Sequence, residues 1–177
     1  MTAHDRYVVL TRVGPGTPMG KYMRYFWHPI AASAEVKDDP VRVKLLGEEL
    51  VLFRTPTGKL GLVQERCPHR CASLSCGMIE DDGIRCSYHG WKFDMSGQCV
   101  ETPAERADSK LKDRVKIASY EAQELGGLVW AWLGEKPAAL LPRFEYLVGE
   151  QYDHDVTISK MPCNWLQISG NNRSEEH

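Results

Sequence analysis

The sequence predicts a mainly β fold, an antiparallel β-sandwich that follows an N-terminal helical segment. From Val41 onward, short apolar runs alternate with turn residues, and this is the pattern of strands that pack against a core. Of the 177 residues, 42% are hydrophobic and 26% are charged, which is ordinary for a globular chain. The chain therefore has enough apolar residues to bury a core.

The first predicted element is an amphipathic helix in the segment 1–40. Apolar side chains recur there at positions i, i+3, i+4 and i+7, which places them on one face of a helix. We expect this face to pack against the core and the intervening basic residues to face water. The apolar residues are Met19, Tyr22, Met23 and Phe26, and the basic residues are Lys21 and Arg24.

Short antiparallel strands are predicted next, over the segment 41–135. Turn residues near Gly47-Glu48 and at Thr55-Pro56-Thr57-Gly58 separate the first three strands. The charged stretch from Glu101 to Arg114 is expected to be a solvated loop. The predicted strands are 41–45, 50–54, 60–64, 84–86, 91–93, 115–120 and 128–133.

Residues 136–150 are predicted to be a connection that ends the β domain. Lys136-Pro137 and Pro142 interrupt the regular pattern there. Strand-like alternation resumes from Tyr152 to Met161. We therefore expect a new structural unit to begin at about residue 151.

Two short segments each combine one cysteine with one histidine. They are Cys67-Pro68-His69 and Cys86-Ser87-Tyr88-His89, with residues 70–85 between them. Two thiolates for one iron and two imidazoles for a second iron are the ligands of a Rieske 2Fe-2S cluster. We therefore expect Cys67, His69, Cys86 and His89 to bind such a cluster. Because neutral imidazoles replace two thiolates, the ligand set predicts a one-electron carrier of fairly high reduction potential.

A structural zinc site is the alternative, because two cysteines and two histidines also bind zinc in a tetrahedral arrangement. Zinc sites usually pair cysteine with cysteine and histidine with histidine along the chain, and the mixed pairs here depart from that spacing. We expect the other cysteines to be reduced thiols or core residues. These cysteines are Cys71, Cys76, Cys99 and Cys163. A disulfide between Cys71 and Cys76 is conceivable but unsupported.

Residues beside the ligands are candidates for tuning the site. Tyr88 and Trp91 would shield a cluster, and Arg70 could donate hydrogen bonds toward its sulfur atoms. For Trp91, simple core packing is an equally good interpretation. These side chains are therefore expected to surround the ligands without binding metal.

Charge and hydropathy patterns argue against two classes of partner. The formal net charge is −2 and the basic residues are dispersed, so no basic stripe indicates nucleic-acid binding. The longest apolar stretch, Leu128 to Leu133, is too short to span a bilayer, and the N-terminus lacks a signal-peptide pattern. We expect a cytoplasmic protein that binds neither nucleic acid nor membranes.

The residues around the ligands closely resemble the oxygenase component of Rieske non-heme iron oxygenases. The resemblance rests on Cys67-Pro68-His69-Arg70 and on Tyr88-His89-Gly90-Trp91-Lys92-Phe93-Asp94. The stretch from Leu10 to Gly20 resembles the opening of the phthalate 4,5-dioxygenase type, a group near vanillate demethylase. The resemblance extends to about Ile168 and implies a Rieske-type β-sandwich over 41–135, then the beginning of an α+β catalytic domain over 151–177.

The family's catalytic iron site is only partly matched. In that family an Asn-Trp pair opens a helix that continues through Glu-Asn to Asp-x-x-His-x-x-x-x-His. Asn164-Trp165 and Asn171-Asn172 agree with this pattern, whereas Gly170 and Ser174 stand at its Glu and Asp positions. His177 falls on the first iron-binding histidine, and the second histidine and the carboxylate of the iron triad are missing. We therefore expect no catalytic residue here, and mononuclear Fe(II) only where a complete catalytic domain exists.

The resemblance also implies partners. They are a flavin and iron-sulfur reductase as electron donor, an aromatic acid or related small molecule as substrate, and a homotrimeric assembly. A stand-alone electron-transfer module resembling Rieske ferredoxins is the alternative. We favour the oxygenase subunit, because a free ferredoxin needs neither the N-terminal helical segment nor the continuation past Pro142.

Overall fold

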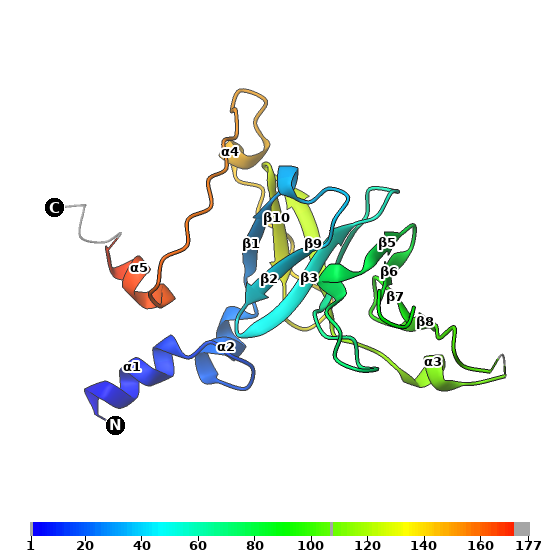
Figure 1. Cartoon of the computed structure of the whole chain (residues 1–177). Helices are drawn as coiled ribbons and strands as arrows, with labels where there is room; N and C mark the ends of the chain where they lie inside the picture. Colours follow the sequence, from blue (N-terminus) through cyan, green and yellow to red (C-terminus); the bar gives the residue numbers. More distant parts are fainter. Residues whose placement is uncertain (1, 107, 172–177) are drawn as a thin grey trace.

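A computed structural model describes residues 2–106 and 108–171 of the chain (Figure 1). Most of these residues that form regular structure belong to antiparallel strands. The strands are β1 (Trp27–Ala32), β2 (Val41–Leu45), β3 (Glu48–Arg54), β4 (Leu60–Gln64), β5 (Met78–Glu80), β6 (Gly83–Arg85), β7 (Lys92–Asp94), β8 (Cys99–Glu101), β9 (Ser119–Leu125) and β10 (Leu128–Trp132). The α-helices are α1 (Ala3–Thr11), α2 (Pro18–Met23), α3 (Leu111–Arg114), α4 (Glu145–Val148) and α5 (Trp165–Asn171), and the 3-10 turns are η1 (Ser33–Glu35) and η2 (Leu74–Cys76).

The strands form two sheets. The larger has six strands in the order β1-β10-β9-β4-β3-β2, and the smaller has four in the order β5-β6-β7-β8. Figure 1 shows the small sheet beside the β3 and β9 side of the large one. This architecture confirms the mainly β, antiparallel fold class that the sequence predicts.

Tight turns of matching twist join neighbouring strands of the large sheet. Leu45 pairs with Glu48 across β2 and β3, and the two residues between them, Leu46 and Gly47, both have positive φ angles of 46° and 79°. Two positive φ angles are the mark of the type I′ hairpin turn, which glycine favours. Any side chain at Gly47 would also meet the backbone of Gly14, 2.8 Å from an ideal Cβ. The turn therefore fixes the register of β2 and β3.

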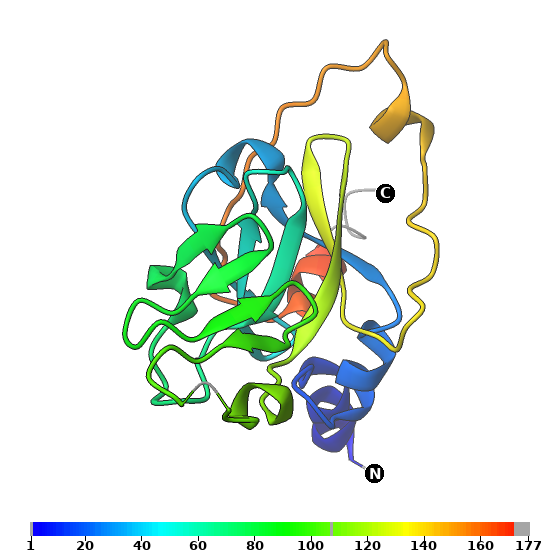
Figure 2. The same ribbon diagram turned by 90° about the vertical axis from the view of Figure 1, so that its right-hand side faces the viewer.

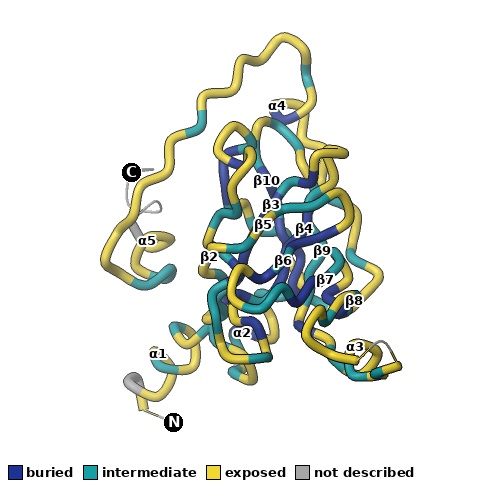
Figure 3. The backbone as a smooth tube through the Cα atoms, turned by 45° about the vertical axis from the view of Figure 1, so that its right-hand side comes forward, coloured by how far each residue is buried: buried dark blue, intermediate teal, exposed yellow. Residues whose placement is uncertain are grey.

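The strand β3 divides the core into two clusters of buried side chains. Val51 and Phe53 pack on the side of the small sheet, together with Trp91 and both predicted metal-ligand cysteines. Leu50 and Leu52 point to the opposite cluster, which also contains buried residues of β1, β2, β4 and β10. Because successive side chains of a strand alternate between its faces, β3 is buried on both sides. Figure 3 shows this buried centre.

The predicted amphipathic helix is wrong in length, and only part of its apolar face is confirmed, because Met23 packs against the core cluster that contains Leu50. Helix α2 ends at Met23, and Tyr22 and Phe26 are 61% and 47% exposed. The buried residue is Gly20, where an ideal Cβ would lie 2.3 Å from the Gly14 carbonyl oxygen. The turn that precedes α2 therefore packs against the helix at Gly20, where there is no room for a side chain. Arg24, expected to face water, instead forms an ion pair with Glu48.

The segment 1–40, expected to be helical, also contains a strand. β1 pairs with β10 in the large sheet, and its register shifts between Pro29 and Ala31. Proline removes a ladder hydrogen bond and is found at bulges, so it hides the strand pattern in the sequence. The proposed domain boundaries are not tested by this observation and stay predictions.

The chain beyond β10 runs outside the sheets, through α4 to α5 (Figure 2). The predicted strand from Tyr152 to Met161 is wrong, because this segment has no regular structure and most of its apolar residues, such as Ile158, are exposed. Residues 155–159 line a cavity beside the edge strand β1, but their backbone does not pair with that strand. Helix α5 begins at Trp165, whose indole nitrogen donates to the Leu10 carbonyl of α1. Asn172, Ser174 and His177 lie outside the described residues.

None of the helices in the described part of the chain has the length and apolar character of a membrane-spanning helix.

Candidate metal centre

The two Cys/His segments form two loops of matching backbone geometry. In each loop the N–H four residues after the cysteine donates to the cysteine carbonyl, from Cys71 to Cys67 at 2.9 Å and from Gly90 to Cys86 at 3.0 Å. The cysteine N–H in turn donates to the carbonyl five residues on. Cys71 and Gly90 both have positive φ, 56° and 73°. The loops therefore have one shape, although one contains Cys-x-His and the other Cys-x-x-His.

Each loop is closed as a hairpin. Arg66 pairs with Ser73 across the first loop through an isolated bridge. Arg85 pairs with Lys92 across the second loop, between β6 and β7. The residue before each cysteine thus pairs with the residue seven positions further on.

The two cysteines are buried side by side. Cys67 and Cys86 are 1% and 2% exposed, and their thiols are close enough to interact. Burial raises the pKa of the Cys67 thiol to about 11, with the neighbouring thiol adding to the effect. A buried thiolate needs a compensating cation, and a metal centre supplies one. The pair is therefore suited to binding metal.

The two histidines form a second pair. The ring centroids of His69 and His89 are 4.7 Å apart at an angle of 66°. The Nδ1 atom of His89 is buried without a hydrogen-bond partner. A buried ring nitrogen with no partner is costly unless a metal ion occupies it. Loss of hydration, together with the nearby His69 and Arg70, lowers the pKa of His89 from its ordinary value of 6.5. This favours the neutral imidazole that binds metal.

The arrangement fits a two-iron cluster better than a single metal ion. Among residues 2–106 and 108–171, no group of three or more His, Cys, Asp or Glu side chains could hold one ion. A tetrahedral zinc site needs its four ligands around one point. A Rieske cluster needs two thiolates at one iron and two imidazoles at the other. The thiol pair and the imidazole pair satisfy that division.

Two aromatic residues flank the histidines, as the sequence analysis expects. Trp91 stacks on His69, with ring centroids 4.6 Å apart and planes 3° from parallel. It is 6% exposed and belongs to the core cluster, so core packing and shielding hold together for this residue. Tyr88 lies against His89 at 3.9 Å and is 58% exposed, so it covers that ring on the solvent side.

The other cysteines stay unbridged. All six cysteines of the chain are free thiols, and Cys71 and Cys76, for which a bridge is conceivable, are both exposed. Cys99 is 2% exposed and belongs to the same core cluster as Cys67. It offers a buried cysteine outside the two loops.

An ion network crosses the small sheet beneath the second loop, and the sequence analysis missed it. Arg85 contacts Glu80 on β5 and Glu101 on β8, and Lys92 contacts Glu80 at 2.8 Å. Lys92 also contacts Asp82 at 2.6 Å. The network therefore joins all four strands. The one feature of the sequence that could have indicated it is that each ligand cysteine directly follows an arginine.

Replacing Glu80 with glutamine is expected to weaken the fold in a pH-dependent way. Hydrogen bonds from Arg85 and Lys92 lower the pKa of Glu80 from 4.5 to about 2. The carboxylate therefore stabilises the folded chain above about pH 4.5, and this contribution is lost as pH falls toward 2. Glu80→Gln should lower the free energy of unfolding by about 1 kcal/mol at pH 7. Urea unfolding at pH 7 and pH 3 should show the gap from the unmodified chain closing at the lower pH.

The matched control is Glu105→Gln, which changes an exposed carboxylate on a loop. It should leave the free energy of unfolding unchanged at both pH values. A gap for Glu80→Gln that is the same at pH 3 as at pH 7 would show that the charge of Glu80 does not stabilise the sheet.

The fold and the paired Cys/His loops define a Rieske iron-sulfur domain. The family model for the Rieske [2Fe-2S] domain matches residues 26–121, and the chain belongs to this family, whose cofactor is a 2Fe-2S cluster.

Several relatives are named as oxygenase subunits, in agreement with the resemblance found in the sequence. The chain is 46% identical over 172 residues to the 5,5'-dehydrodivanillate O-demethylase oxygenase subunit of Sphingobium sp., covering 95% of this chain and 41% of that protein. It is 41% identical over 174 residues to the phthalate 4,5-dioxygenase oxygenase subunit of Pseudomonas putida, covering 95% and 39%. The chain thus spans about two fifths of the length of these relatives.

The chain is also similar in structure to a solved oxygenase. Dicamba monooxygenase with non-heme iron and dicamba superimposes with a TM-score of 0.62 and 31% sequence identity. The match covers 70% of this chain and 38% of that one. Sequence and structure therefore place the chain beside the same kind of protein.

Proposed function

We propose that the chain is the Rieske part of an oxygenase subunit, with Cys67, His69, Cys86 and His89 as the cluster ligands. The observation that carries this proposal is that the two matching loops hold two buried thiols close together and two histidine rings 4.7 Å apart, one of which has a buried Nδ1 atom without a partner. When bound, a Rieske cluster supplies one-electron transfer at a higher potential than an all-cysteine cluster. The chain would accept electrons from a reductase and deliver them to a mononuclear iron, where the whole protein oxidises an aromatic acid or related substrate.

The residues of the chain have separate tasks in this function. The loops keep the two thiols buried and away from water, and Trp91 covers one face of His69. The histidine rings are only partly buried, so they lie between the core and the surface. Electron transfer slows steeply with distance, and a partner that docks on this side would come near the ligands.

We favour the oxygenase subunit over a stand-alone ferredoxin-like module. The support is that the relatives are oxygenase subunits and that their similarity continues past the Rieske domain, over 95% of this chain. We accordingly propose a helical segment over 1–40, a Rieske domain over 41–135, a linker over 136–150 and the beginning of a catalytic domain over 151–177. No catalytic residue is assigned within the chain.

The partners follow from the same proposal. From the resemblance to Rieske non-heme iron oxygenases we infer a flavin and iron-sulfur reductase as electron donor and a homotrimer as the assembly. The names of the relatives, oxygenase subunits, support a system of several components. We also infer a cytoplasmic location, since the exposed Cys71 and Cys76 are unpaired and exposed thiols persist in reducing compartments.

Anaerobic reduction tests the electron-transfer function. The purified chain is mixed with NADH and a catalytic amount of a flavin and iron-sulfur reductase, while visible absorbance is recorded. We expect the cluster absorbance to bleach, with one electron taken up per cluster, and the same final spectrum with dithionite. Bleaching by dithionite alone would exclude this class of reductase. No bleaching with either reductant would contradict electron transfer itself.

A further inference from the structure

The two ligand loops share a second feature besides their backbone shape. In the first loop, Arg66 Nη1 donates to the carbonyl of Cys71 at 3.2 Å. In the second, Arg85 Nη1 donates to the carbonyl of Gly90 at 2.8 Å. Each arginine directly precedes a ligand cysteine, and each acceptor is the loop residue with positive φ. The same atom thus reaches the same position in both loops.

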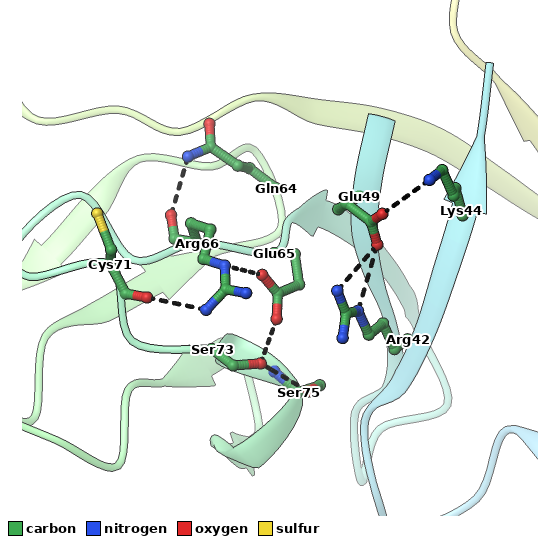
Figure 4. Close-up of polar contacts among 9 residues, drawn as sticks. All are labelled: Arg42, Lys44, Glu49, Gln64, Glu65, Arg66, Cys71, Ser73 and Ser75. Atoms are coloured by element: carbon green, nitrogen blue, oxygen red, sulfur yellow. Dashed lines mark hydrogen bonds and ion pairs between the residues drawn. The ribbon is translucent and has the colours of Figure 1, made fainter. Parts of the chain in front are cut away.

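Each arginine is also held by a carboxylate. Glu65 Oε2 lies 2.7 Å from Arg66 Nε in an ion pair (Figure 4). Glu80 Oε1 accepts a hydrogen bond from Arg85 Nε in the second loop. In the second loop, this hydrogen bond directs Nη1 of the planar guanidinium at the loop carbonyl. In the first loop, the ion pair holds the guanidinium without a hydrogen bond to Glu65 Oε2, so the carboxylate orients Arg66 less strictly than Arg85.

The same carboxylates contact the residue that pairs with the arginine across the hairpin. Ser73 Oγ donates to Glu65 Oε1 (Figure 4), and Lys92 Nζ lies 2.8 Å from Glu80 Oε2. Ser73 is opposite Arg66, and Lys92 is opposite Arg85. At the base of each loop, the arginine, the carboxylate and the residue opposite the arginine thus contact one another. The same arginine also donates to the carbonyl of the residue with positive φ in the loop.

We propose that Arg66 and Arg85 are matched positioning residues. Each clamps one ligand loop, because it directly precedes the ligand cysteine and donates a hydrogen bond to the carbonyl four residues after that cysteine. This inference rests on the proposed ligand set. A charge-assisted hydrogen bond to the carbonyl of a residue in the left-handed region stabilises the reversal of the loop. Because the ligand histidine lies inside that reversal, the clamp fixes where its ring points.

The two clamps differ in burial, which predicts unequal effects. The Arg66 side chain is 55% exposed and its partner carboxylate is 1% exposed. The Arg85 side chain is 18% exposed and also contacts Glu101 at 2.8 Å. A buried, networked guanidinium is held in place more firmly than an exposed one. We therefore expect the second clamp to contribute more than the first.

Cluster retention in variants tests the proposal. Arg66→Gln and Arg85→Gln are purified anaerobically, and cluster absorbance is followed during incubation with an iron chelator. Loss of residues that orient metal ligands typically costs about 10- to 100-fold in metal affinity. We expect loss rates to rise by about 100-fold for Arg85→Gln and about 10-fold for Arg66→Gln. Because a cation beside the ligand cysteine is removed, the midpoint potential should also fall and the EPR g-values should shift.

The control is Arg42→Gln. Arg42 pairs with Glu49 on β2 and β3, is 53% exposed, and contacts neither loop (Figure 4). Its cluster loss rate, potential and g-values should match those of the unmodified chain. Equal effects in all three variants would overturn the proposal, because they would report net charge alone.

Arg85→Lys addresses the case in which Arg85→Gln does not fold. Lysine keeps a cation in the network but cannot bind the carboxylate and the loop carbonyl with the fork of a guanidinium. We expect it to fold and still to lose the cluster faster. Cluster retention like that of the unmodified chain in both Arg66→Gln and Arg85→Lys would overturn the clamp. An unmodified chain without any cluster would instead overturn the proposed function.

Discussion

Replacing Cys67 or Cys86 with serine is expected to abolish the 2Fe-2S cluster. Both thiols are almost fully buried, and each would supply half of the thiolate charge at one iron. A serine hydroxyl ionises far less readily than a thiol and binds iron poorly, so the variant loses a ligand and leaves a buried polar group. The iron and acid-labile sulfide contents of the purified variant should fall to background, and the visible absorbance of the cluster should disappear.

The remaining cysteines provide matched controls. Cys99→Ser changes a cysteine that is as buried as the two ligands, and Cys71→Ser changes an exposed one inside the first loop. Both variants should keep the cluster, because neither thiol belongs to the ligand set. A Cys67→Ser variant with full cluster content, or a Cys99→Ser variant without any, would show that the ligands are wrongly assigned.

Trp91→Ala should produce the largest loss of stability among the residues around the site. The indole is 6% exposed, packs in the core cluster with Phe93, and stacks on His69. Truncation of a buried Trp or Phe to alanine typically costs about 3 to 5 kcal/mol, because it loses apolar burial and leaves a cavity. Chemical unfolding monitored by circular dichroism should show this decrease. The cluster should also decay faster, since water gains access to one face of His69.

Two variants separate packing from shielding. Trp91→Phe keeps an aromatic ring for stacking and should recover most of the stability. Tyr88→Ala removes the exposed ring beside His89 and should change the free energy of unfolding by less than about 0.5 kcal/mol. If Trp91→Ala were as stable as Tyr88→Ala, the indole would not support the core beneath the site.

Much of the β fold could be predicted because its signals are local. Strands β2 and β4 begin and end at the predicted residues, since each is a short apolar run between turn residues. The paired Cys/His segments likewise stand out by residue type and spacing. The three-residue strands β5 and β8 are too short for an alternating pattern, and the sequence analysis missed them.

The errors arise where tertiary contacts override a local pattern. Tyr22 and Phe26 have the spacing of a buried helix face, but close contact between Gly20 and Gly14 turns the side of α2 that carries Gly20 and Met23 inward. The alternation from Tyr152 to Met161 gives no strand, because the segment lies beside the edge strand β1 without pairing with it. The role of Arg66 and Arg85 depends on which carbonyl each reaches, and no sequence spacing reveals this.

Metal and acid-labile sulfide content of the anaerobically purified chain tests the Rieske assignment most directly. The sample is reduced and its EPR spectrum recorded, so that cluster type is read independently of stoichiometry. The ligand set predicts two irons and two sulfides for each Rieske [2Fe-2S] domain, with the EPR signal of a cluster that has histidine ligands. Zinc without sulfide, or a cluster with the signal of four cysteine ligands, would contradict the assignment.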